Sequence, residues 1–210
     1  MLERRHRPVD RDPVRALSST SRCQGPSYLD SAKVAAVPLS AGDIRTALDA
    51  LSEELESATE RAELLVVGGA ALVLLYGARQ ATKDVDACFL KPSAAVVRSA
   101  AARVAGSLDL PEDWLNDGAK AYIVTLTEGP ILYESESLLV RAPSIAQLLA
   151  MKLAAWRDEI DRSDARLLLS NVQGSLEDVR ALIEPLVLPH QRDKAAYALD
   201  DLWESIHGTT

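Results

Sequence analysis

The chain has 210 residues, of which 48% are hydrophobic and 26% are charged, and its formal net charge is −8. No apolar stretch approaches the ~18–20 residues that a membrane-spanning helix needs, and the beginning of the chain lacks the apolar region of a secretory signal. The two cysteines, Cys23 and Cys88, match no zinc or redox spacing. We therefore expect a cytoplasmic protein that has no membrane partner.

The composition also restricts the fold. A single Phe and an abundance of Ala and Leu favour helices packed on a modest sheet over an all-β sandwich. A chain of this length can form one good core with a small helical addition. The predicted fold class is α/β in the α+β sense, with a small mixed sheet flanked by helices and a helical C-terminal portion.

The charge is unevenly distributed along the chain. Residues 1–38 hold seven basic and four acidic residues, which leaves sixteen basic and twenty-seven acidic residues for the rest. A strongly acidic body is a poor non-specific binder of polyanions. If the protein handles RNA, local basic clusters or the first 38 residues must supply the attraction.

The first predicted feature is an extension at residues 1–38. It contains four prolines and shows no lasting strand or helix period, so we expect it to be largely disordered and without a function of its own. Ordered structure is predicted from Ser40, which forms a capping-box pattern with Asp43. Apolar residues at helical spacing then predict a helix that runs to about residue 61.

The next part of the chain predicts alternating strands and helices. An apolar run at 64–67 predicts a buried strand that ends at Gly68 and Gly69. A short helix at 70–76 is stopped by Gly77. The pattern then predicts a strand at 85–90 and a helix at 93–107.

Beyond this helix the predicted structure changes from mixed to helical. A helical turn is expected at 112–117, and alternating or β-branched residues predict strands at 121–126 and 131–140. Helices follow to the end of the chain, at 144–156, 163–171, 176–186 and 189–206. The predicted organisation is the extension at 1–38, a core at 39–142 and a helical portion at 143–210 packed on that core.

The segment at residues 64–89, from the first predicted buried strand through the second, gives the strongest indication of a functional site. Two glycines after a strand allow a ligand close to the backbone, and the start of the following helix offers free N–H groups to phosphate. Asp84 and Asp86 are two residues apart, so on a strand they project from the same face. Paired carboxylates there can hold Mg²⁺, a hard cation that prefers oxygen ligands and substrate phosphates.

Each of these features has a plainer interpretation when it is taken alone. A Gly-Gly pair is most often a tight turn, and an Asp-x-Asp sequence is usually a solvated strand end. The combination is more specific, because a helix-sized segment separates Gly69 from Asp84. We therefore interpret the segment as a functional site.

These residues resemble the active-site signature of the polymerase-β-like nucleotidyltransferase superfamily. Within this superfamily, they resemble more specifically the minimal nucleotidyltransferases that include the AbiE-type toxins and the mycobacterial MenT toxins. The resemblance covers roughly residues 40–203. Further segments that fit this group are 113–117, 132–135 and 149–155. The residues that carry the signature are Gly68, Gly69, Ala70, Gly77, Arg79, Thr82, Lys83, Asp84, Val85 and Asp86.

The resemblance implies roles for individual residues. Gly68 and Gly69 would lie at the phosphates of a nucleoside triphosphate, with Thr82 beside the first metal-binding aspartate. Asp84 and Asp86 would bind the metal, which is Mg²⁺ or alternatively Mn²⁺. The nucleotide is the substrate, and the metal offsets the charge that builds up during nucleotidyl transfer.

The resemblance also implies a contribution from the C-terminal helices. Lys152 matches a lysine that contacts nucleotide phosphates, although a solvated helix lysine is the plainer interpretation. Arg157, Asp161 and Asp164 resemble a basic-then-acidic stretch that ends in a further functional aspartate, which would be Asp164 or alternatively Asp161. Arg79 could steady the triphosphate or could be a solvated loop charge.

A third carboxylate, which many members of the superfamily use to activate the attacking hydroxyl, has no clear counterpart. The segment 121–126 contains no acidic residue. Asp117, Glu134 and Glu136 are candidates, and the spacing does not choose between them. Asn116 is a further candidate site residue.

The predicted activity is metal-dependent transfer of a nucleotide from a nucleoside triphosphate to an acceptor hydroxyl. By resemblance, the acceptor would be RNA, most specifically the 3′ end of tRNA, and the protein a toxin with a cognate antitoxin. One alternative acceptor is a protein side chain or a cationic small molecule such as an aminoglycoside. Another alternative is a catalytically lapsed module that binds nucleotides or proteins.

Overall fold

The computed structural model describes residues 38–77 and 79–208, which all lie within one compact unit. The predicted extension at 1–38 falls almost entirely outside these residues and stays a prediction. Among the described residues, no helix combines the length and the apolar character that crossing a membrane requires.

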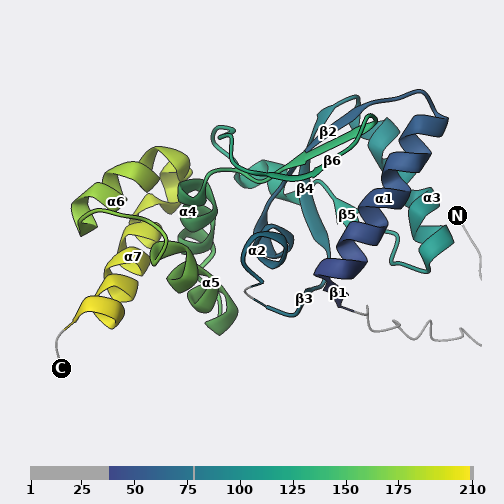
Figure 1. The fold of residues 1–210 in the computed structure, drawn as a ribbon. Coiled ribbons are helices and arrows are strands. Elements are labelled where there is room, and N and C mark those ends of the chain that lie inside the picture. Colours follow the sequence, from purple (N-terminus) through teal and green to yellow (C-terminus); the bar gives the residue numbers. More distant parts are fainter. Residues whose placement is uncertain (1–37, 78, 209–210) are drawn as a thin grey trace, which may run out of the picture. The chain divides into compact units, whose positions relative to one another are not determined.

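A five-stranded mixed sheet forms the centre of the fold, with the strand order β5-β4-β2-β7-β6 (Figure 1). Strand β2 is the middle strand and pairs antiparallel with β4 and parallel with β7. Strands β1 and β3 form a separate two-stranded sheet. The bounds are β1 Leu39–Ser40, β2 Ala62–Val66, β3 Ala81–Thr82, β4 Val85–Lys91, β5 Leu115–Asn116, β6 Ile131–Glu134 and β7 Leu138–Arg141.

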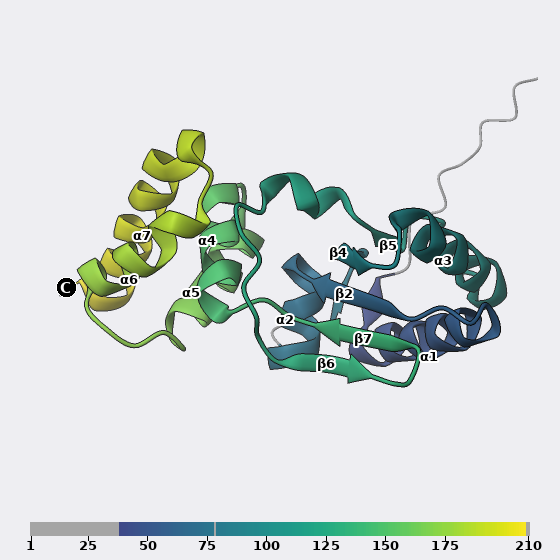
Figure 2. The same cartoon turned by 90° about the horizontal axis from the view of Figure 1, so that it is seen from above.

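Two helices pack side by side and contact this sheet, as both views show (Figures 1 and 2). Helix α1 (Ala41–Ser57) begins with the predicted capping box between Ser40 and Asp43 and buries an apolar face of Ile and Leu residues. Helix α3 (Ala94–Leu108) buries mainly Ala and Val, whose small size lets the two helices approach closely. The predicted helices at these places are confirmed.

The C-terminal helices pack around α4 (Ile145–Ala155), which contacts α5, α6 and α7. Helix α4 is apolar on nearly all sides, which is typical of a helix at the centre of a bundle. Two short 3₁₀ helices connect α6 to α7. The bounds are α5 Glu159–Leu169, α6 Leu176–Ile183, η2 Glu184–Leu186, η3 Pro189–Gln191 and α7 Arg192–His207. The predicted mixed α+β class with a helical C-terminal portion is confirmed.

Three local predictions were wrong. The expected helical turn at 112–117 contains strand β5, which pairs parallel with β4. The expected strand at 121–126 is instead the end of the 3₁₀ helix η1 (Gly118–Tyr122) followed by loop. The expected strand at 131–140 is a hairpin of β6 and β7.

The segment that was predicted as the strand at 121–126 is held by side-chain bonds instead of sheet pairing. Gln147 is 1% exposed, and its amide donates to the carbonyl of Thr125 and accepts from the backbone N–H of Thr127. These bonds satisfy backbone groups that a sheet would otherwise pair. The alternating apolar residues therefore stay at the surface, with Tyr122 58% exposed.

Candidate active site

The end of β2 and the start of β4 lie side by side at the same end of the sheet, because these neighbouring strands are antiparallel. The backbone N–H of Val67 donates to the carbonyl of Asp86 at 2.9 Å. Gly68 follows in the left-handed region with φ 60°, and a Cβ there would lie 3.3 Å from Oδ2 of Asp86. A glycine is required at this point by the backbone conformation, and it leaves room beside the carboxylate.

Gly69 lies in the first turn of helix α2 (Gly68–Tyr76), next to two polar side chains. A Cβ on Gly69 would lie 2.6 Å from the hydroxyl oxygen of Thr82 and 3.3 Å from a guanidinium nitrogen of Arg79. The structure therefore brings both glycines, Thr82 and Arg79 together with Asp86. The first turn of α2 presents free backbone N–H groups at the same place.

Asp84 and Asp86 are both half-buried, one just before β4 and one on it. Burial raises the pKa of Asp84, and the negative charge of Asp86 raises it further. A carboxylate whose charge is destabilised by burial and by a neighbouring carboxylate is suited to a divalent cation, which would relieve the repulsion. The oxygens of the two carboxylates are the hard ligands that Mg²⁺ prefers, so the donor set fits this metal.

The described residues contain no group of three or more His, Cys, Asp or Glu side chains placed to hold a metal ion. A cation at Asp84 and Asp86 would therefore complete its coordination with other oxygens. Water and substrate phosphates usually supply these ligands to Mg²⁺. The pair fits a metal that is shared with a phosphorylated substrate.

Lys152 lies at the centre of a second charged cluster, on the last turn of α4. Its Nζ is 2.9 Å from a carboxylate oxygen of Asp161 and 2.8 Å from one of Asp164, both on α5. The Lys152 side chain is only 11% exposed, so it is not the solvated helix lysine of the plainer interpretation. Its position is determined by two buried acidic partners.

Two arginines complete this cluster. Arg157 donates from Nε to Asp161 at 2.9 Å, and its backbone N–H donates to the same oxygen at 3.2 Å. Arg79, from the loop between α2 and β3, pairs with Asp164. Arg79 therefore connects the glycine end of the sheet to α5, and the cluster holds three cations against two carboxylates.

Asp161 is fixed in its charged form. Burial by itself would raise its pKa, but hydrogen bonds from Arg157 and Lys152 outweigh this effect and lower the pKa to about 2. Both carboxylate oxygens are occupied by these donors. A carboxylate of such low basicity is a poor general base near neutral pH.

Trp156 directs the chain between Lys152 and Arg157. It ends α4 in the left-handed region with φ 34°, which is unfavourable for a bulky residue and turns the chain toward α5. The guanidinium carbon of Arg162 lies 5.4 Å from the centre of the half-buried indole ring. This turn brings Arg157 back to Asp161.

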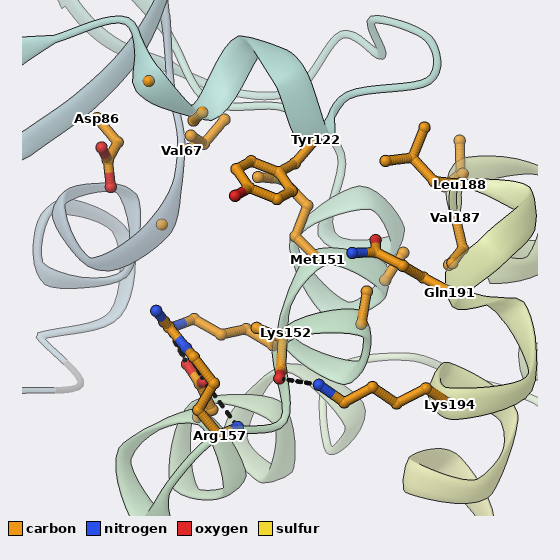
Figure 3. Close-up of a pocket in the computed structure, with 18 residues that line it drawn as sticks. Val67, Asp86, Tyr122, Met151, Lys152, Arg157, Val187, Leu188, Gln191 and Lys194 are labelled. Carbon is orange, nitrogen blue, oxygen red and sulfur yellow. Dashed lines mark hydrogen bonds and ion pairs between the residues drawn. The ribbon is translucent and has the colours of Figure 1, made fainter.

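A cavity of about 420 Å³ separates the two charged clusters (Figure 3). Gly68 and Asp86 line one wall, and Lys152, Arg157 and Asp161 line the opposite wall. This volume lies within the range of ~300–1,000 Å³ that is common for small-molecule sites. The cavity therefore places an aspartate for metal binding opposite fixed cations, an arrangement suited to a polyanionic ligand.

Residues 46–208 match the family described as "Nucleotidyltransferase of unknown function (DUF6036)". The chain belongs to this family. The prediction of a nucleotidyltransferase, and with it a transferase, is confirmed at the level of the family. The narrower resemblance to AbiE-type and MenT toxins stays a prediction. No curated protein matches the chain.

The remaining candidate residues of this nucleotidyltransferase differ in their position relative to the cavity. Asn116 on β5 pairs in register with Asp86, and its side chain accepts from the backbone of Gly118, which lines the cavity. The carboxylate of Asp117 is held by Arg98, with one contact at 2.7 Å. A hydrogen bond from this arginine is the main reason that the pKa of Asp117 is lowered.

Glu134 lies away from the glycine and aspartate residues of the nucleotidyltransferase. It is on the edge strand β6, which β7 and β2 separate from β4. Its partner in the hairpin is Leu139, near the start of β7 and of its neighbour β2. Glu134 therefore stands at the opposite end of the sheet from Gly68, and Glu136 follows it in the adjoining turn.

Sequence reasoning missed the part of the cavity that η1 and the C-terminal helices form. These residues share no motif, and several come from short 3₁₀ segments whose period is not visible in the sequence. Helical spacing placed their helices but gave no reason to group their side chains. The missed lining residues are Tyr122, Met151, Leu186, Val187, Leu188, Gln191 and Lys194.

Proposed function

We propose that this protein transfers a nucleotide from a nucleoside triphosphate to an acceptor hydroxyl and releases pyrophosphate, with Mg²⁺ or Mn²⁺ as cofactor. One observation supports this most strongly: a single cavity has Gly68 and Asp86 on one wall and Lys152 and Arg157 on the other. A nucleoside triphosphate has the negative charge and the size that such a cavity accommodates.

The glycine end of the cavity would bind phosphate through the backbone. Free N–H groups at the start of α2 favour an anion, and the glycines let it approach closely. The hydroxyl of Thr82 and the guanidinium of Arg79 lie directly over Gly69 and can add donors. These contacts would hold the triphosphate against the start of the helix.

Asp84 and Asp86 would hold the metal, which when bound screens the charge on the reacting phosphates. Without a cation, the two carboxylates would repel the triphosphate. They therefore make binding of the nucleotide depend on the metal. Removal of the metal by a chelator should weaken binding of the nucleotide as well as transfer.

Lys152 and Arg157 would face the triphosphate from the opposite wall. In this proposal Asp161 and Asp164 are positioning residues, since they fix these cations and Arg79 through charge-assisted bonds. Cations that are already fixed lose little conformational entropy when the nucleotide binds. We assign neither aspartate the role of general base.

We propose RNA, specifically the 3′ end of tRNA, as the acceptor, in a toxin that has a cognate antitoxin in the cytoplasm. Support comes from the resemblance to the AbiE-type and MenT toxins and from the seven basic residues in the first 38. The acidic remainder of the chain favours a second candidate, a cationic acceptor such as an aminoglycoside, through long-range attraction. A protein side chain is the third acceptor to test.

The test is incubation of the purified protein with each α-labelled nucleoside triphosphate and total RNA, a protein mixture or an aminoglycoside. Mg²⁺, Mn²⁺ and EDTA are compared in parallel, and Asp86→Asn is the matched variant. We expect label in the tRNA fraction with either metal and none with EDTA or the variant. Label in the protein or aminoglycoside fraction would show that the acceptor is not tRNA. Absence of metal-dependent transfer to any acceptor would contradict the proposed activity.

A further inference from the structure

The cavity has a second, chemically different half. Beyond Lys152 its lining is mainly apolar, with the Tyr122 ring, the Met151 side chain and the aliphatic residues Val187 and Leu188 (Figure 3). The charged groups discussed above lie at the other end in the same view. A triphosphate gains nothing from an apolar surface, so this half suits another part of a ligand.

We propose that this apolar half binds the nucleobase of the nucleoside triphosphate and that Gln191 determines which base is accepted. This inference rests on the proposed function and extends it to the choice of substrate. A nucleobase is flat, apolar on its faces and polar along its edge. The apolar half offers both kinds of contact.

The faces of the base would contact Tyr122 and Met151. An aromatic ring stacks on any base, and a thioether adapts to the remaining surface. Tyr122 is 58% exposed, which leaves its ring free for such a contact. A cavity of about 420 Å³ suits one nucleotide better than two, so the base would belong to the donor nucleotide.

The polar edge of the base would meet Gln191. This residue is half-buried at the end of η3, where it precedes α7, and Figure 3 shows its amide directed into the cavity. A glutamine amide presents one acceptor and two donor hydrogens side by side, and base edges differ in the order of these groups. The order in which the Gln191 amide presents its acceptor and donors to the ligand would therefore favour some base edges over others.

A comparison with two other polar side chains shows why Gln191 is the best candidate. Lys194 also lines the cavity, but its ammonium donates to the carbonyl of Ala155 at the end of α4. Gln147, by contrast, is buried, and both ends of its amide are bound to the 125–127 segment. Gln191 combines both hydrogen-bonding functions with access to the ligand.

The experiment measures dissociation constants of the four nucleoside triphosphates and of inorganic tripolyphosphate by calorimetry with Mg²⁺. It compares the wild type with Gln191→Leu and with Gln173→Leu, an exposed glutamine outside the cavity lining. We expect the wild type to prefer one base by at least about tenfold, which one or two hydrogen bonds supply. Gln191→Leu should remove most of this preference, and Gln173→Leu should keep it.

A second variant tests the stacking surface. Tyr122→Ala should lower the affinity for all four nucleoside triphosphates roughly tenfold. The affinity for tripolyphosphate should stay the same in every variant, because it reports the charged half alone.

Unchanged base preference in Gln191→Leu would overturn the inference. Gln191→Leu could instead leave nucleotide binding unchanged and alter which acceptors are used in the transfer assay. That result would place the terminal base of the acceptor in the apolar half and would also overturn the inference. Failure of the proposed function has a different signature: nucleotides bind selectively, but the wild type transfers no label.

Discussion

The two walls of the cavity are built in different ways. The wall with Gly68 and Asp86, the aspartate wall, comes from residues 62–86, where one strand, one helix and the start of the next strand follow each other closely; Gly69 and Asp84 adjoin it outside the cavity lining. The wall with the cations needs α4, α5 and the Arg79 loop to pack together. The first wall is encoded locally, whereas the second exists only in the folded chain.

The walls also differ in how their charges are balanced. Asp84 and Asp86 repel each other, and burial together with this repulsion raises the pKa of Asp84. The cations opposite are already paired with Asp161 and Asp164. The aspartate wall therefore gains stability from a bound cation, while the cation wall is stable without a ligand. The following predictions test this difference.

The largest effect is expected from Asp86→Asn, on the aspartate wall. Transfer should fall roughly 100- to 1,000-fold, because a metal at a reacting phosphate contributes several kcal/mol. Thermal stability without metal should be equal or higher, since the charge beside Asp84 is removed. Transfer assays and melting curves on the same samples measure both. Asp201→Asn, an exposed change on α7, is the control, and activity retained by Asp86→Asn would contradict the metal site.

Lys152→Met tests the cation wall and should lower two quantities together. Affinity for every nucleoside triphosphate should fall about 10- to 150-fold, since one charge-assisted contact is worth ~1.5–3 kcal/mol. The free energy of unfolding should also fall, because Asp161 and Asp164 lose a shared partner inside the protein. Binding and urea unfolding measure these changes.

Lys91→Met is the matched control for this variant. Its side chain is 68% exposed and forms a surface pair with Glu63, so nucleotide affinity and stability should both change little. If Lys152→Met leaves stability unchanged, the cluster is not the preorganised wall described above.

The Asp161→Asn variant should reveal the pH dependence of the cation wall. The folded-state pKa of about 2 lies below the ordinary aspartate value of 3.8, so the charged Asp161 stabilises the fold fully at pH values above 3.8. The stabilisation is about 2 kcal/mol and is lost as the pH falls from 4 toward 2, with about half remaining at pH 3. Unfolding free energies of wild type and variant should therefore converge at low pH.

Asp117→Asn is a useful comparison because Asp117 is also bonded to an arginine, but at the surface. Solvent screens that pair, so its contribution to the pH dependence should be smaller. The two free energies of unfolding, of wild type and of Asp161→Asn, could also differ by the same amount at every pH. That result would show that the buried pairing of Asp161 does not stabilise the fold.

The smallest effect is expected at Gly68, again on the aspartate wall. Gly68→Ala should destabilise the fold by about 1–2 kcal/mol, because alanine is unfavourable in the left-handed region. Gly106→Ala is the control, since this exposed glycine lies in α3 with no atom near the added carbon, and it should stabilise by up to ~1 kcal/mol. Equal melting temperatures for the two variants would contradict this interpretation.

The sequence was sufficient to predict most elements and the aspartate wall. Hydrophobic spacing located α1, and Gly77 in the left-handed region ends α2 as expected. The glycines and aspartates meet because β2 and β4 pair antiparallel, which brings the end of one to the start of the other. These features depend on a period, a cap or a strand pairing between near neighbours.

The cation wall and the apolar half depended on tertiary packing. Asp161 and Asp164 are three residues apart on α5, but nothing local shows that both reach Lys152 or that Arg79 joins them. Segment 121–126 alternates like a strand, yet the buried amide of Gln147 holds its end as a loop. A two-residue strand such as β5 is too short to show any period.

The position of Trp156 has an optical consequence. Its indole is half-buried between Lys152 and Arg157 in the chain, with the Arg162 guanidinium over the ring. Trp114 is fully buried in the core, and Trp203 packs on His207 with ring centroids 4.4 Å apart. A polyanion bound beside Lys152 and Arg157 would alter the electric field at the first indole more than at the others. The protein thus contains a natural fluorophore whose emission should report occupancy of the site without any added label.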